Sequence, residues 1–137
     1  VTETSIIADD RLAIRILSEL RELGIKIAID DFGTGYSSLS TLQRLPIQTL
    51  KIDRVFVRDV FERPDRAAIV DMILALSASM QLDVVAEGIE IDAEADFLKT
   101  KACGYGQGFL YSRPLPPDSL ERYLMSHQGI AAPCRPG

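Results

Sequence analysis

Helical spacing of apolar residues predicts amphipathic helices in several parts of the chain. Residues 11–23 place their leucines and an isoleucine on one face, with Asp9 and Asp10 available as caps and Gly24 as a stop. A longer helix is expected over 69–80, where the apolar residues again share one face. Shorter helices are predicted over 39–45, over 93–101 and from Pro117 onward.

Short apolar runs between these helices predict strands. The runs are nearly continuous, which is typical of parallel strands buried on both faces. The expected strands are 25–29, 49–52, 83–86 and 105–110, the last of them weakened by its glycines. Because strands alternate with helices, the fold class is α/β, with parallel pairing through right-handed crossovers.

Polar side chains stand at or near the carboxyl end of every predicted strand. Four strands would bring Asp30, Lys51, Glu87 and Gln107 to one rim, as in a (β/α)8 barrel. An open doubly wound sheet would instead concentrate its ligand contacts at one crevice. A whole barrel takes roughly 250 residues, so the pattern predicts a TIM-type barrel of which this chain is roughly the C-terminal half. The chain begins at Val1, and we expect it to be a piece of a longer protein.

Composition and charge narrow the possible partners. The net charge of -5 argues against binding to a nucleic-acid polymer, since the chain has no basic stripe to neutralise phosphates. No apolar run approaches the roughly 20 residues of a membrane span, so this segment is expected to make no membrane contact. Two cysteines, Cys103 and Cys134, are too few for a disulfide framework and suit a reducing cytoplasm. We therefore expect a cytoplasmic location, although upstream segments could anchor the parent protein to a membrane.

The adjacent acids Asp30 and Asp31 are the first candidates for chemistry. In one interpretation, one of them caps the following turn and the other is solvated. In the other, they bind a cation, because two carboxylates at a strand end raise each other's pKa unless a positive charge lies between them. Carboxylate oxygens are hard ligands suited to Mg2+ or Mn2+. The second interpretation predicts a metal site at the rim.

Each of the other rim residues has a purely structural interpretation as well as a functional one. Lys51 could extend from its strand to water, or it could hold a phosphate oxygen. Glu87 could be a helix cap, a metal ligand or a general base. Gln107 lies between two glycines and could satisfy the backbone of a bulge. Their common position at one rim favours the functional reading for all of them.

Together, these motifs resemble the C-terminal half of an EAL domain, and they follow in unbroken order up to about residue 126. The motifs are Thr2-Glu3-Thr4, the run from Asp30 to Leu39 (DDFGTGYSSL), Leu45-Pro46, Leu50-Lys51-Ile52-Asp53, Val84-Val85-Ala86-Glu87-Gly88-Ile89-Glu90, Gln107-Gly108 and Ser112-Arg113-Pro114-Leu115-Pro116. The resemblance implies a bacterial TIM-type barrel that hydrolyses cyclic di-GMP to linear pGpG with Mg2+ or Mn2+, using two ions.

The resemblance also implies roles for individual residues. Asp30 matches a metal ligand, and Asp31 matches a neighbour that binds a second metal or orients water. Lys51 matches the lysine near the attacking water and the scissile phosphate. Glu87 matches the essential glutamate, which acts as a general base or as a second-metal ligand.

Three further positions match less central residues of the family. Glu90 and Gln107 match residues of the substrate pocket, and Glu3 matches the glutamate that anchors the mobile loop bearing the two aspartates. In the family this loop contributes to a homodimer interface, so a homodimer is implied. We expect residues 1–126 to form the C-terminal part of the EAL domain and residues 127–137 to form a disordered tail.

The family's remaining ligands are expected upstream of Val1. They are the glutamate of the Glu-Ala-Leu tripeptide, an asparagine and a metal-binding glutamate, so the isolated 137 residues are expected to be inactive. Two other functions remain open: a degenerate EAL module that binds cyclic di-GMP or a partner protein without hydrolysis, and an unrelated barrel enzyme acting on phosphorylated small molecules. A sensory or GGDEF-type domain could also precede this segment.

Overall fold

The computed structural model describes residues 10–34 and 39–126 of the chain. Four parallel strands form one sheet in this part of the chain: β1 (Ala28–Phe32), β2 (Thr49–Ile52), β3 (Asp83–Ala86) and β4 (Tyr105–Gly106). The helices are α2 (Asp10–Glu22), α3 (Leu39–Arg44), α4 (Arg54–Val57), α5 (Pro64–Ser79), α6 (Asp92–Thr100) and α7 (Pro117–Ser126).

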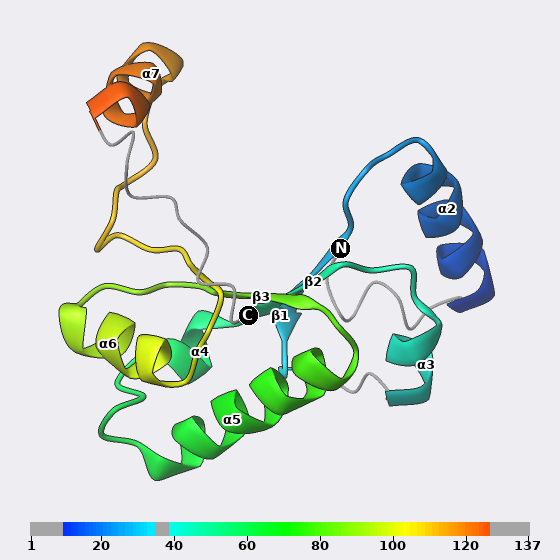
Figure 1. Cartoon of the computed structure of the whole chain (residues 1–137), viewed down its shortest axis with the longest axis horizontal. Helices are drawn as coiled ribbons and strands as arrows, with labels where there is room; N and C mark the ends of the chain where they lie inside the picture. The colour runs from blue at the N-terminus through cyan, green and yellow to red at the C-terminus, as the bar shows by residue number, and fades with distance from the viewer. Residues whose placement is uncertain (1–9, 35–38, 127–137) are drawn as a thin grey trace.

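The strands lie side by side in their sequence order, β1-β2-β3-β4 (Figure 1). Each neighbouring pair is parallel, and a helical segment connects each strand to the next. An open doubly wound sheet reverses its strand order at one point, whereas a barrel does not. The predicted α/β class is therefore confirmed, and the order of the strands is that of a barrel segment.

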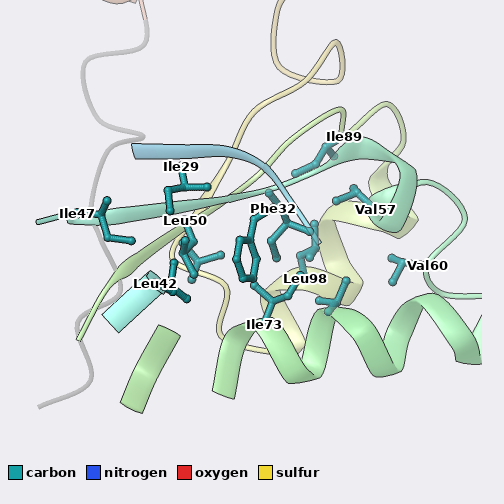
Figure 2. Close-up of a cluster of buried hydrophobic side chains, with 14 of the residues drawn as sticks. Ile29, Phe32, Leu42, Ile47, Leu50, Val57, Val60, Ile73, Ile89 and Leu98 are labelled. Carbon is teal, nitrogen blue, oxygen red and sulfur yellow. The ribbon is translucent and has the colours of Figure 1, made fainter. Parts of the chain in front are cut away.

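The core lies between the sheet and helices α5 and α6. Leu50 and Ile52 of β2 are fully buried on one face of the sheet, and α5 packs against β2 and β3. Figure 2 shows Ile73 of α5 reaching toward Phe32 of β1 within this apolar cluster. Each fully buried side chain of this size contributes about 1.5–3 kcal/mol of transfer free energy. The buried face fixes the register, so Lys51, between the two buried residues of β2, points to the other face.

Helix α7 stands apart from this core in Figure 1, whereas α2 adds Leu17 to the edge of the core. On α2, Leu17 is buried, whereas Leu12 and Leu23 are 52% and 78% exposed. The apolar face predicted for residues 11–23 is therefore only partly covered within the described residues. Helix α7 begins at Pro117 as predicted, and none of its residues is buried.

The first strand lies three residues further along the chain than the predicted 25–29. Gly24 adopts a positive φ of 81°, and the N–H of Ile25 donates to the carbonyl of Leu20, so residue 25 still belongs to the turn that ends α2. At its other end, β1 continues through both aspartates to Phe32. Asp30 and Asp31 therefore lie within the strand and not after it.

The fourth strand is shorter than the predicted 105–110. Only Tyr105 and Gly106 pair with β3, and the residues that follow β4 form hydrogen bonds with Ile89. The carbonyl of Gln107 accepts from the N–H of Ile89, and the N–H of Leu110 donates to the carbonyl of Ile89. These bonds to the connection after β3 take the place of further ladder pairing.

Helix α4 was not predicted. A carboxylate oxygen of Asp53 accepts from the N–H of Val55 at 2.7 Å and so caps its start. The helix is one turn long and contains two valines, whose β-branched side chains favour strands. The tail that we expected over 127–137 lies outside the described residues.

Candidate functional site

A β-bulge in β1 builds the acidic part of the site. Ile29 pairs with Leu50, but Phe32 pairs with Ile52, so β1 carries one more residue than β2 over this interval. Asp31 is the bulged residue and adopts a left-handed conformation with a φ of 56°. Ile29 and Phe32 thereby stay in the core, and both aspartates remain available at the rim.

A single lysine lies among three carboxylates at this rim. Nζ of Lys51 is 3.0 Å from Oδ1 of Asp30 and also forms an ion pair with Oε1 of Glu87. One carboxylate oxygen from each of Asp30, Asp31 and Glu87 lies within 4.8 Å of the others. The structure therefore brings together four of the predicted residues from three neighbouring strand ends.

The four groups shift one another's proton affinity. Burial raises the pKa of Asp30, but the hydrogen bond and the charge of Lys51 lower this pKa by a larger amount. The pKa of this carboxyl is therefore below its usual range. Burial raises the pKa of Glu87, and Lys51 offsets this only in part. Burial and the charges of Asp30 and Asp53 raise the pKa of Asp31. Burial lowers the pKa of Lys51, but its bonds to Glu87 and Asp30 raise it to a net value above the ordinary one.

These carboxylates fit a divalent cation. Oxygens that coordinate one ion at 2.0–2.6 Å lie at most about 4–5 Å apart, and the three carboxylates meet this limit. All the donors are hard oxygens, and one ammonium serves three acids, so a cation would relieve their mutual repulsion. The donor set suits Mg2+, Mn2+ or Ca2+ better than a soft metal.

Asp53 is a member of the site that sequence reasoning did not single out. It caps α4, and its carboxylate lies close enough to Asp31 to raise the pKa of that residue. An aspartate directly after the strand at 49–52 is a recognisable helix-capping signal. The following Arg-Val-Phe-Val run concealed it, because this run is not typical of a helix.

The remaining predicted residues lie around this cluster. Glu90 lines a cavity of about 510 Å3 together with Asp53, Arg54 and Arg58. Gln107 lines a second cavity of about 570 Å3, bordered by residues that follow β4. These two residues therefore belong to different cavities. Glu3 lies outside the described residues, so its predicted role is untested.

Comparison with known families identifies the region around this cluster. The family model described as EAL domain matches residues 1–114. Cyclic di-GMP phosphodiesterase NbdA of Pseudomonas aeruginosa is 44% identical, over 97% of this chain and 17% of its own length. Cyclic di-GMP phosphodiesterase PdeR of Escherichia coli is 42% identical, over 90% of this chain and 19% of its own length. The chain thus spans about a fifth of the length of these curated relatives.

Solved structures give the same result for the fold. The PaMucR phosphodiesterase in complex with c-di-GMP superposes with a TM-score of 0.83 at 47% identity, over 88% of this chain and 49% of that chain. The EAL domain of Mycobacterium smegmatis DcpA gives a TM-score of 0.85 at 40% identity, over 91% and 56%. Klebsiella pneumoniae BlrP1, solved with manganese and cy-diGMP, gives 0.75 at 40% identity, over 83% and 29%. The chain therefore covers about half of an EAL barrel, as predicted.

Within the described ranges, 10–34 and 39–126, the helices are too short or too polar to cross a lipid bilayer.

Proposed function

Because the chain belongs to the EAL domain family, we propose that its parent protein is a metal-dependent phosphodiesterase that hydrolyses cyclic di-GMP to linear pGpG in bacterial second-messenger signalling. The observation that carries the proposal is the convergence of Asp30, Asp31 and Glu87 around Lys51 at one end of a parallel sheet. The names of NbdA and PdeR support the substrate, since both are described as cyclic di-GMP phosphodiesterases.

The carboxylates would hold the cofactor, for which we propose two Mg2+ or Mn2+ ions. When bound, such ions neutralise the phosphodiester and lower the pKa of water. Asp30, Asp31 and Glu87 would supply oxygen ligands from this half of the barrel. The calcium and manganese complexes of BlrP1 with cy-diGMP support a site of this kind in the family.

The ammonium of Lys51 would be able to act in the reaction once a bound cation neutralises Asp30 and Glu87. This ammonium carries three N–H donors and is held at the cluster by Asp30 and Glu87. From there it can donate to a phosphate oxygen, whose negative charge grows in the transition state, or orient the attacking water. Burial keeps this charge effective, because the side chain is only 22% exposed.

Glu90 and Gln107 would contact the substrate outside the reacting centre. Each lines a cavity next to the acidic cluster, and the two cavities follow different strands. A cyclic dinucleotide has two nucleotide halves, so contacts in two places are what its recognition requires. Residues 1–126 would form this part of the domain, and Glu3 would anchor the loop that bears the aspartates.

Hydrolysis by the parent protein tests the proposal. With Mg2+ or Mn2+, it should convert cyclic di-GMP to pGpG, and Glu87→Gln should abolish turnover while leaving the circular dichroism spectrum unchanged. The matched control is Glu62→Gln, an exposed glutamate in the connection between α4 and α5, which should keep wild-type rates. Near-normal pGpG release by Glu87→Gln would contradict the assignment. Binding of cyclic di-GMP without turnover by the wild type would favour the degenerate module.

We propose that the 137-residue chain is inactive by itself. It covers about half of the barrel seen in its structural relatives, and an open barrel exposes unpaired strand edges. The purified chain should release no pGpG at concentrations where the parent protein is active, and measured hydrolysis would refute this. A homodimer, an added sensory or GGDEF-type domain and a cytoplasmic location are further proposals for the parent protein.

A further inference from the structure

A buried carboxylate lies outside the acidic cluster. Glu94, in the first turn of α6, is 2% exposed. Its Oε2 accepts from the N–H of Glu90 at 2.8 Å and from the N–H of Ile91 at 3.3 Å. Its Oε1 accepts from the N–H of Asp59 at 3.1 Å. One side chain therefore binds three backbone groups from two separate segments.

These three bonds offset the cost of burying the carboxylate. None of the ion pairs in the described part of the chain involves Glu94. Backbone N–H donors and the positive end of α6 take the place of a cation. Hydrogen bonds from N–H groups require short, aligned contacts, so Glu94 fixes the distance between its two partner segments.

The two segments each contribute one wall to the 510 Å3 cavity. The wall after β3 bears Glu90, and the wall formed by α4 and its C-cap bears Arg54 and Arg58, of which Arg58 directly precedes Asp59. Glu94 is bonded to the backbone of both walls, through Glu90 on one side and Asp59 on the other. The width of the cavity at this point therefore depends on Glu94.

Nearer the acidic cluster, backbone hydrogen bonds that do not involve Glu94 hold the connection after β3 in place. The N–H of Glu87 donates to the carbonyl of Ile52, and both backbone groups of Ile89 bond to the segment after β4. Glu94 binds this connection only through the N–H groups of Glu90 and Ile91. Loss of its carboxylate should therefore displace Glu90 more than it displaces Glu87.

We propose that Glu94 is a positioning residue that sets the place of Glu90 against the α4 wall and so determines the affinity for cyclic di-GMP. This inference rests on the proposed function. Glu94 is not itself a lining residue of the cavity, and it acts through the backbone of Glu90. Its removal affects substrate binding, and the chemical step is spared because Glu87 keeps its own backbone bonds.

Steady-state kinetics of the parent protein separate these effects. Glu94→Gln keeps the shape but turns an NH2 group toward at least one donor, and Glu94→Ala removes every acceptor. We expect KM to rise about tenfold in Glu94→Gln and more in Glu94→Ala, since bonds to charged groups of this kind are among the stronger ones, with kcat changed less than about threefold. The control is Asp92→Asn, an exposed acid in the same helical turn, which should keep the wild-type KM.

A double-mutant cycle with Glu90→Ala tests the route of the effect. If Glu94 acts through Glu90, adding Glu94→Gln to Glu90→Ala raises KM no further. Additive effects, an unchanged KM, a loss of kcat alone or an equal effect of Asp92→Asn would each overturn the inference. So would loss of folding in both Glu94 variants, because it would make Glu94 a residue of general stability.

The outcome for the wild type separates this inference from the proposed function. An active wild type with an unchanged KM in the variants refutes the role of Glu94 alone. If the wild type binds cyclic di-GMP without hydrolysis, the same comparison uses the Kd from calorimetry. If it neither binds nor hydrolyses cyclic di-GMP, the proposed function fails, and the role of Glu94 fails with it.

Discussion

Gly108 lies where two backbone segments approach too closely for any side chain. A Cβ atom at this position would lie 2.0 Å from the carbonyl oxygen of Ile89 and 2.3 Å from its nitrogen. Both are main-chain atoms, so no rotamer change can relieve the contact. We therefore expect Gly108→Ala to destabilise the parent protein and to displace the connection that carries Glu87.

The structure also gives the magnitude of this effect. Ordinary van der Waals contact begins at 3.4 Å, so the segments must separate by about 1.4 Å to accept a methyl group. Two backbone bonds, from Ile89 to Gln107 at 3.1 Å and from Leu110 to Ile89 at 3.0 Å, cross this gap. Both would be lost, at about 1–3 kcal/mol for each group left buried and unpaired. The free energy of unfolding should therefore fall by about 2–6 kcal/mol.

Urea denaturation of the parent protein followed by circular dichroism measures this change. Gly104→Ala is a matched control, because its Cβ would meet only the carbonyl oxygen of Val84, at 3.8 Å. The control should change stability by less than about 0.5 kcal/mol. If Gly108→Ala lost no more than Gly104→Ala, the close approach of Gly108 to Ile89 would not be a feature of the folded protein.

Two further predictions concern charge and protonation. Lys51→Met should lower kcat at least about tenfold while Mn2+ binding, measured by calorimetry, becomes tighter, because a cation no longer competes with an ammonium for Asp30 and Glu87; weaker Mn2+ binding would contradict the arrangement at the rim. Burial raises the pKa of the Cys103 thiol, so its reactive thiolate forms only at higher pH than that of a free cysteine. In a Cys134→Ser background, alkylation of Cys103 at pH 8 should be slower than that of glutathione and should rise at higher pH, and a rate equal to that of glutathione would show that the thiol is not shielded.

Sequence patterns predicted the helices and the central strands well, since burial repeats with the period of each element. The strands at 49–52 and 83–86 have the predicted bounds, because their apolar runs end where burial ends. The long helix occupies Pro64–Ser79 and ends just before Met80, the last residue of its predicted apolar face. Local patterns suffice for such elements, because each buries residues at the spacing typical of its type.

The first strand could not be placed correctly, because its position depends on a neighbour. Two charged residues in a row ordinarily end a buried strand, so the predicted strand ended at Ile29, before Asp30. The β-bulge against β2 lets the strand pass through both acids and bury Phe32. Such a bulge is a property of the pair of strands, and single-strand periodicity does not contain it.

The composition of the site was predictable to a similar extent. Asp30, Lys51 and Glu87 follow from the rule that parallel strands present their carboxyl ends at one rim, and the structure brings them into contact. Glu94 was missed, because it lies in a helix four residues beyond Glu90, the last residue of its motif, and its partners are backbone groups. A glutamate in the first turn of the helix predicted over 93–101 was the available signal, and it occupies the third position of α6.

The bulge at Asp31 makes the number of residues in β1 as important as their kinds. Deletion of one residue between Ile29 and Phe32 would restore a regular ladder, in which Ile29 and the phenylalanine still face the core and only one acid remains between them. A point substitution of either aspartate removes one ligand and can keep the bulge, whereas a deletion removes one ligand together with the bulge that presents the pair. Among related sequences, a gap at this position would therefore be a stronger sign of lost catalysis than a replaced aspartate.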